Sequence, residues 1–132
     1  MHEPIRIVVA EDNPGDAYLL EQALRREPQL CELRFFEDGE EAFRFLSRME
    51  PYADAQRPDL IVLDLNLPKR DGWELLQFIR HDETLKSVPV AVISSAPADL
   101  AKQSLQQANR YIKKPMRLDE YMQIGRQILA LL

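Results

Sequence analysis

Cysteine is almost absent from this sequence of 132 residues, and Cys31 is the single example. One cysteine cannot form an internal disulfide, and it excludes the cysteine-rich zinc sites that need several thiolates. The chain also has no apolar stretch long enough to span a bilayer and no signal-peptide pattern near Met1. These absences predict a soluble protein of a reducing compartment, and we expect a cytoplasmic location with no membrane partner.

Glycine is also scarce, with four examples at positions 15, 39, 72 and 125. Both the phosphate-binding P-loop and the dinucleotide-binding fingerprint need glycines at fixed short spacings, and the spacing of these four glycines matches neither motif. Acidic residues outnumber basic residues by 22 to 17, which gives a net charge of −5. A chain with this net negative charge lacks the extended basic surface that binds a nucleic-acid phosphate backbone, so we expect no direct nucleic-acid partner.

The strongest apolar segment runs from Leu60 to Leu63 and is followed by Asp64. Four consecutive apolar residues indicate a central strand of a parallel sheet that helices cover on both faces. Asp64 would then lie at the carboxyl end of this strand, where open α/β sheets bind their ligands. A second interpretation is that Asp64 only caps the turn that follows. Taken alone, this segment supports both interpretations equally.

Strand-like and helix-like segments alternate along the rest of the chain. Asn13 before Pro14, and Asp38 followed by Glu41, are signals for the start of two helices. Apolar runs predict strands over residues 5–10, 31–36, 60–63, 88–93 and 110–113. Helical spacing predicts helices over 14–27, 39–49, 73–81, 100–108 and from 118 to the C-terminus. This alternation predicts one α/β domain over residues 1–132, with a doubly wound parallel sheet.

Polar side chains follow the predicted strands at their carboxyl ends, namely Glu11 and Asp12, Asp64, Ser94, and Lys114. In a doubly wound sheet these ends meet in one crevice. Carboxylates there would repel one another by about 4 kcal/mol per pair at about 4 Å and an effective dielectric constant near 20, so the site should recruit a cation. Carboxylate oxygens in an incompletely enclosed site suit Mg²⁺.

A divalent ion, a lysine and a hydroxyl around one carboxylate form a phosphoryl-transfer site, because that chemistry mainly needs positioning and neutralised charge. Asp64 would be the nucleophile. The alternative is that the carboxylates at the strand ends bind no ligand and that Lys114 only neutralises part of their negative charge. The coincidence of five suitable residues at the strand ends favours a functional site.

Together these motifs resemble the receiver domain of two-component response regulators, over essentially the whole chain. The motifs are Glu11-Asp12 after the first strand, Asp64 followed by Leu-Pro-x-x-Asp-Gly, Ser94 after the fourth strand, and Lys114-Pro115. The segment Glu-Asp-Asn-Pro-Gly-Asp at 11–16, in a chain that ends with its fifth helix, resembles the stand-alone, phytochrome-associated regulators. The resemblance implies a flavodoxin-like sheet of strand order 2-1-3-4-5. It also implies a sensor histidine kinase as partner, a bacteriophytochrome in the narrower resemblance.

The same resemblance assigns the phosphoacceptor and the metal ligands. It implies that Asp64 accepts a phosphoryl group from a phosphohistidine of the kinase. It places Mg²⁺ at the side chains of Asp12 and Asp64 and at the backbone carbonyl of Asn66. Glu11 is expected to reach the ion through a water molecule.

Three further residues are expected to respond to the phosphoryl group. Lys114 pairs with the carboxylate and then with the phosphoryl group, and its bond to Pro115 is expected to be cis. Ser94 moves to hydrogen-bond the phosphoryl oxygens, and Tyr111 occupies the aromatic switch position behind it. Because each contact with a phosphoryl oxygen is charge-assisted, these bonds can bias a two-state loop.

The last predicted helix is apolar over about half of its circumference, which is wider than one sheet-facing stripe requires. Its apolar residues include Tyr121, Ile124, Gly125 and Ile128. We expect these residues to form a homodimer interface, together with the strand predicted over 110–113 or the helix predicted over 100–108, because Gly125 would allow close approach of a second copy. The alternative is a C-terminal helix that is merely apolar at its end.

The sequence therefore predicts a phosphorylation-controlled switch and not an enzyme, with a downstream protein partner and no output domain of its own. One alternative is an adaptor that keeps the receiver fold but responds to no phosphoryl group. Another is a small flavin protein, since flavodoxins share this topology. The acidic crevice disfavours the flavin, whose phosphate would have to bind without a metal.

Overall fold

The computed structural model of the protein describes residues 3–95 and 107–132. Its centre is a parallel sheet of five strands in the order β2-β1-β3-β4-β5. This order confirms the predicted doubly wound α/β fold. The strands are β1 (Ile5–Ala10), β2 (Cys31–Phe36), β3 (Leu60–Asp64), β4 (Val90–Ser94) and β5 (Arg110–Lys113).

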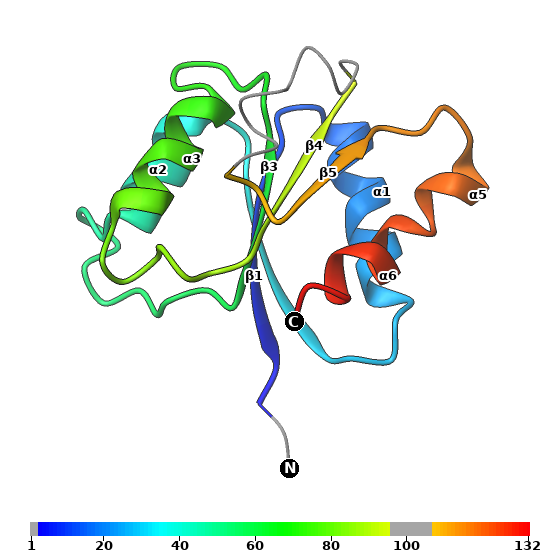
Figure 1. The fold of residues 1–132 in the computed structure, drawn as a ribbon, viewed down its shortest axis with the longest axis horizontal. Coiled ribbons are helices and arrows are strands. Elements are labelled where there is room, and N and C mark those ends of the chain that lie inside the picture. The colour runs from blue at the N-terminus through cyan, green and yellow to red at the C-terminus, as the bar shows by residue number, and fades with distance from the viewer. Residues whose placement is uncertain (1–2, 96–106) are drawn as a thin grey trace.

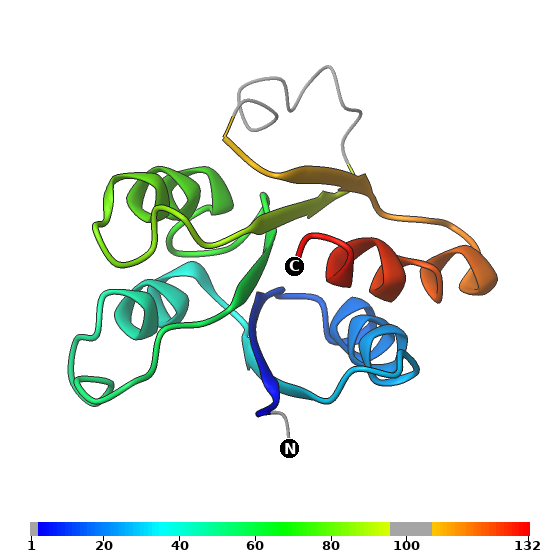
Figure 2. The same ribbon diagram turned by 60° about the horizontal axis from the view of Figure 1, so that its bottom comes forward.

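The helices cover the two faces of the sheet (Figures 1 and 2). Helices α2 and α3 lie on one face, and α1, α5 and α6 lie on the other. All five residues of β3 are buried, as expected of a strand between two helical layers. The helices are α1 (Pro14–Arg25), α2 (Gly39–Leu46), α3 (Gly72–His81), α5 (Leu118–Tyr121) and α6 (Ile124–Leu129).

Side-chain caps start the three longest helices of the described chain, and two of these caps were predicted. The Asn13 side chain accepts a hydrogen bond from the backbone N–H of Asp16, at 3.0 Å. Asp38 accepts one from the N–H of Glu41 at 2.8 Å, and Asp71 starts α3 in the same way. Each cap satisfies an N–H group that would otherwise lack a partner in the first helical turn.

Two element boundaries differ from those predicted. Helix α2 ends at Leu46 and not near Met49, because Arg48 adopts a φ of 59°, a left-handed conformation that cannot continue the helix. Strand β4 begins at Val90, two residues later than expected. The helix expected over residues 100–108 falls almost wholly outside the described residues, and Ala108 lies in the turn before β5.

The predicted C-terminal helix is divided into α5 and α6. At the junction the N–H of Gln123 donates to the carbonyl of Glu120, three residues earlier, at 3.1 Å. Met122 and Gln123 both keep right-handed helical dihedrals, so the division is one tightened turn and the helical direction continues.

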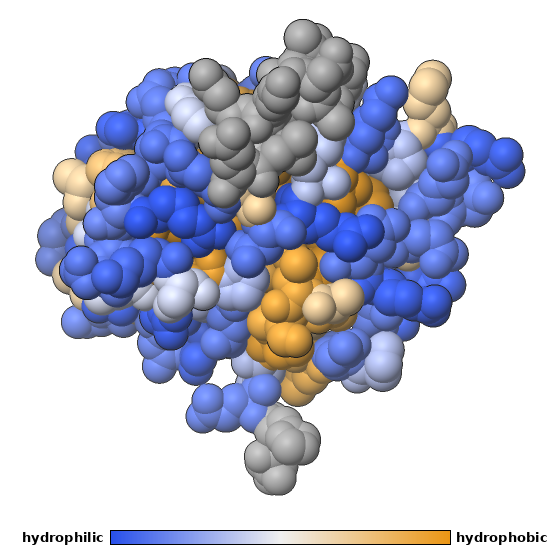
Figure 3. Space-filling view, in the orientation of Figure 1, coloured by the Kyte–Doolittle hydropathy of each residue, from blue (hydrophilic) through white to orange (hydrophobic). Residues whose placement is uncertain are grey.

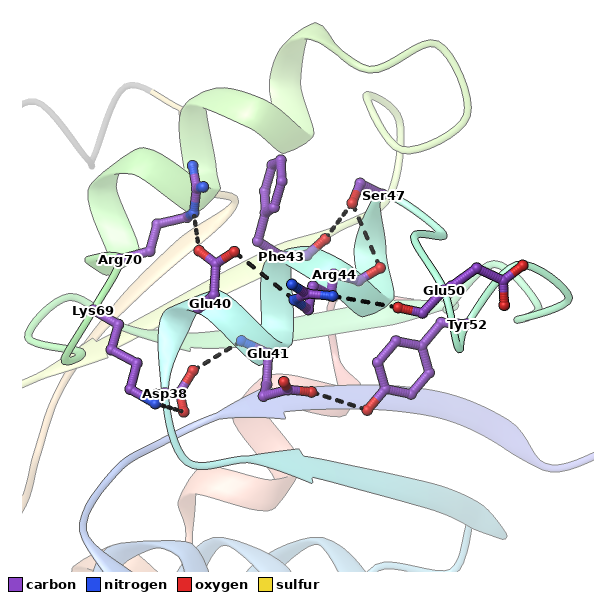
Figure 4. Close-up of polar contacts among 10 residues, drawn as sticks. All are labelled: Asp38, Glu40, Glu41, Phe43, Arg44, Ser47, Glu50, Tyr52, Lys69 and Arg70. Atoms are coloured by element: carbon purple, nitrogen blue, oxygen red, sulfur yellow. Dashed lines mark hydrogen bonds and ion pairs between the residues drawn. The ribbon is translucent and has the colours of Figure 1, made fainter.

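The first turn of α2 is held against the loop that follows β3 (Figure 4). The N–H of Gly39 donates to the carbonyl of Pro68 at 3.1 Å. A Cβ atom on Gly39 would overlap the carbonyl group of Arg70. The absence of a side chain at Gly39 therefore allows the helix and the loop to approach this closely.

Ion pairs reinforce this contact between α2 and the loop. Asp38 lies 3.4 Å from the Lys69 ammonium, and Glu40 lies 3.2 Å from the Arg70 guanidinium. The same guanidinium lies 3.9 Å from the centroid of the Phe43 ring, within the range of a cation–π contact. Helix α2 thereby fixes the loop that begins directly after Asp64.

The surface seen in Figure 3 is mostly hydrophilic, with an apolar patch near the C-terminal end of the chain. Within the ranges 3–95 and 107–132, every helix is too short or too polar to cross a bilayer.

Candidate functional site

The carboxyl ends of the strands bring the predicted polar residues together. Glu11 follows β1 directly, and Asp64 is the last residue of the neighbouring β3. Lys114 follows β5, where its backbone N–H donates to the carbonyl of Ser94 at 2.8 Å. Because β4 separates β3 from β5, only a long side chain can reach Asp64 from this position.

The Lys114 ammonium contacts three carboxylates. Its Nζ lies 2.7 Å from Oδ2 of Asp64, 2.9 Å from Oε1 of Glu11 and 3.0 Å from Oδ2 of Asp16. The Lys114 side chain is 13% exposed, and that of Glu11 is fully buried. These ion pairs are shielded from water and are therefore stronger than pairs on an open surface.

The two oxygens of Asp64 have different partners. Oδ2 accepts from Lys114, and Oδ1 accepts from the backbone N–H of Asn66 at 2.9 Å. The carboxylate is only 3% exposed. Asp64 is thus oriented from both sides, and it does cap the following turn as well as facing the ammonium. The two interpretations of this residue are compatible.

Burial and neighbouring charge shift the pKa of the groups in this site. Burial and the charge of Asp64 raise the pKa of Glu11 from 4.5 to about 7, against the opposing hydrogen bond from Lys114. Burial alone would lower the pKa of Lys114, but its hydrogen bonds to Asp64, Glu11 and Asp16 outweigh this effect and raise it. Lys114 therefore stays charged at neutral pH.

The raised pKa of Glu11 predicts a pH dependence of stability in the absence of metal. The folded protein holds a proton on Glu11 that the unfolded chain releases above about pH 4.5, so the free energy of unfolding should fall as the pH rises from 4.5 to about 7. The Glu11→Gln variant lacks this titration. Urea unfolding in a chelator, near pH 5 and near pH 8, should show the wild type losing more stability than the variant. Equal losses would contradict the prediction.

Three carboxylates can approach one cation. Glu11, Asp12 and Asp64, which we call the acidic cluster, each offer an oxygen, and these atoms lie within 4.8 Å of one another. Asp12 is exposed, so the cluster is open on one side. Hard oxygen ligands with room for water are the donor set that Mg²⁺ prefers, and the residues present fit this ion.

The other predicted site residues lie near the same edge of the sheet. Ser94 is the last residue of β4 and is buried, and Tyr111 of β5 is half-buried. Asn66 is exposed, and its backbone N–H is the group that the Asp64 side chain caps. The described residues contain one cis peptide bond, Glu50–Pro51, so the expected cis bond between Lys114 and Pro115 is not found.

The four residues predicted to form a dimer interface lie in the core of this chain. Tyr121, Ile124 and Ile128 are at most 3% exposed and pack against the sheet face that α1 also covers. A Cβ atom on Gly125 would overlap the backbone carbonyl of Ala23 in α1. Gly125 thus allows close approach of α6 to α1 of its own chain, which corrects the prediction that these residues form an exposed interface.

The role of Asp16 was not predicted from the sequence. This residue was noted as part of a motif, but its contact with Lys114 was not expected. Its position, in the first turn of the helix that begins just after Asp12, was the available signal.

The fold and the site define a receiver domain. The family model of the response regulator receiver domain matches residues 7–125, and the chain belongs to this family. Among its relatives, the response regulator Rcp1 of Synechocystis sp. is 39% identical over 93 residues. The match covers 70% of this chain and 63% of Rcp1, so it spans less than two thirds of that relative.

Two solved structures show the same similarity. The phosphorylated cyanobacterial phytochrome response regulator RcpA superposes with a TM-score of 0.89 at 41% identity, over 96% of this chain and 91% of RcpA. The Mn²⁺-bound form of Rcp1 superposes with a TM-score of 0.86 at 32% identity, over 96% of this chain and 93% of Rcp1.

Proposed function

We propose that this chain is a response regulator that stores a phosphoryl group on Asp64 with the help of Mg²⁺. The observation that carries this proposal is the position of Asp64. It is a buried carboxylate, 2.7 Å from a lysine ammonium and within reach of two further carboxylates that can hold a cation. A nucleophile, a fixed positive charge and a metal site are the parts that phosphoryl transfer needs.

The chain's own residues have distinct roles in this transfer. An oxygen of Asp64 attacks the phosphorus of a phosphohistidine, so that a P–O bond forms as the P–N bond breaks and the histidine nitrogen leaves. Lys114 neutralises charge on the phosphoryl oxygens. Asp12, Asp64 and the carbonyl of Asn66 would hold Mg²⁺, with Glu11 reaching it through a water molecule, and the ion would supply the remaining positive charge. Ser94 and Tyr111 would convert the added phosphoryl group into a changed surface.

The similarity to RcpA, a cyanobacterial phytochrome response regulator, supports a phytochrome-type sensor histidine kinase as the donor. Signal output would pass through a downstream protein partner, and the site would serve as a phosphoacceptor and not as an enzyme. A single domain over residues 1–132 and a cytoplasmic location complete the proposal. The homodimer stays a prediction and requires a surface other than the four core residues of α5 and α6.

The test is incubation of the purified protein with Mg²⁺ and a small phosphodonor such as phosphoramidate. Mass spectrometry should show one added phosphoryl group, and Asp64→Asn should abolish it, since the amide is not a nucleophile. Asp59→Asn is the control, because Asp59 is exposed and precedes β3 at the end of the strand opposite Asp64, so it should leave the modification intact. Modification of Asp64→Asn to the wild-type extent would place the phosphoryl group elsewhere. No modification of the wild type would favour the phosphorylation-independent adaptor.

A further inference from the structure

Among the residues that the structure describes, Asp16 is the one partner of the Lys114 ammonium that lies outside the acidic cluster. Its Oδ2 is 3.0 Å from Nζ, while the oxygens that can share a cation come from Glu11, Asp12 and Asp64. The first turn of α1 holds Asp16 in place, because its backbone N–H donates to the Asn13 side chain. Asp16 therefore faces the ammonium from a fixed position.

We propose that Asp16 is a positioning residue that competes with the phosphoryl group for Lys114. This inference rests on the proposed phosphoryl transfer to Asp64. A lysine ammonium has three N–H donors, and that of Lys114 lies within 3.0 Å of carboxylate oxygens of Glu11, Asp16 and Asp64. When oxygens of Glu11 and Asp64 turn toward a cation, Asp16 is the carboxylate that remains to hold the ammonium.

This competition gives Asp16 two effects of opposite sign. Its negative charge offsets the repulsion between the Lys114 ammonium and a cation bound nearby, so it favours metal binding. The same contact withholds the ammonium from an incoming phosphoryl group and adds negative charge close to an anionic donor, so it slows phosphorylation. A residue that only supported the fold would affect both properties in the same direction.

The test compares the wild type with Asp16→Asn, which removes the charge and keeps the shape. Titration with Mg²⁺, followed by the fluorescence of Trp73, the single tryptophan of the chain, should show an affinity weaker by about fivefold. At saturating Mg²⁺ the initial rate of phosphorylation by phosphoramidate should rise by about fivefold. Asp16→Glu should stay close to the wild type in both measurements, because the negative charge is retained.

Asp119→Asn is the matched control, since Asp119 is exposed and its side chain contacts Arg117. It should change neither property. A loss of both Mg²⁺ affinity and phosphorylation rate in Asp16→Asn would indicate a structural role and overturn the inference, as would no change in either. A wild type that accepts no phosphoryl group contradicts the proposed function instead. The Mg²⁺ affinities alone then decide whether Asp16 acts through Lys114.

Discussion

Gly39→Ala should lower the free energy of unfolding by about 3 kcal/mol, at the upper end of the usual cost of overpacking. The added Cβ atom would overlap the carbonyl group of Arg70, and backbone atoms cannot rotate away as a side chain can. The helix or the loop must therefore move, and the hydrogen bond from Gly39 to Pro68 must lengthen or break. Urea unfolding, monitored by circular dichroism, measures this loss.

The same substitution should weaken Mg²⁺ binding. The loop that it displaces begins at Leu65 and includes Asn66, whose backbone carbonyl is a proposed ligand. Gly15→Ala is the control, because a Cβ atom there meets only the Asn13 side chain, at 3.2 Å. Its effect on stability should stay within about 1 kcal/mol, the scale of the helix propensity difference between glycine and alanine. Equal stability of the two variants would show that the contact with Arg70 is not restrictive.

Lys114→Met should lower the free energy of unfolding by about 3 to 5 kcal/mol when no metal is present, because it leaves buried carboxylates without their cation. Methionine fills a similar volume but cannot neutralise Glu11 and Asp64, which repel each other once both are charged. Chemical unfolding in a chelator at neutral pH provides the measurement.

Mg²⁺ should restore much of the stability of this variant. A ligand at 100 times its dissociation constant stabilises the folded state by about 2.7 kcal/mol, and a cation is the charge that the altered site lacks. Lys113→Met, a neighbouring exposed lysine, is the control and should be nearly neutral. If Mg²⁺ stabilised Lys114→Met no more than the wild type, the lost stability would have to come from packing and not from charge.

The sequence predicted the residues at the strand ends because a parallel sheet has only one edge where they can meet. An apolar run such as Leu60–Leu63 restricts where the strand can lie in the fold, since a strand without polar residues must be covered on both faces. Once the order of the strands is set, the backbone places Glu11, Asp64 and Lys114 at the same edge of the sheet, and the long side chain of Lys114 spans the strand between them. Spacing along the chain was therefore sufficient for this part of the site.

The contact of Asp16 could not be predicted in the same way. It depends on how far the Lys114 side chain extends past Asp64 and on the angle between β1 and α1. The spacing of residues along the sequence indicates neither of these. The apolar width of the C-terminal helix was misinterpreted for a related reason. Helix α6 packs against the sheet and against α1 at once, so two apolar sides are buried within a single chain.

Helix α1 carries Asp16 near its beginning and Ala23 near its end, and the backbone of Ala23 is the part of α1 that Gly125 approaches closely. Asp16 and Ala23 are seven positions apart, which corresponds to about 10 Å along the helix axis, and a helix as short as α1 does not bend appreciably over this distance. Helix α1 thus contacts α6 through Ala23 and the Lys114 ammonium through Asp16, so one rigid element joins the C-terminal segment to the phosphoryl-transfer site.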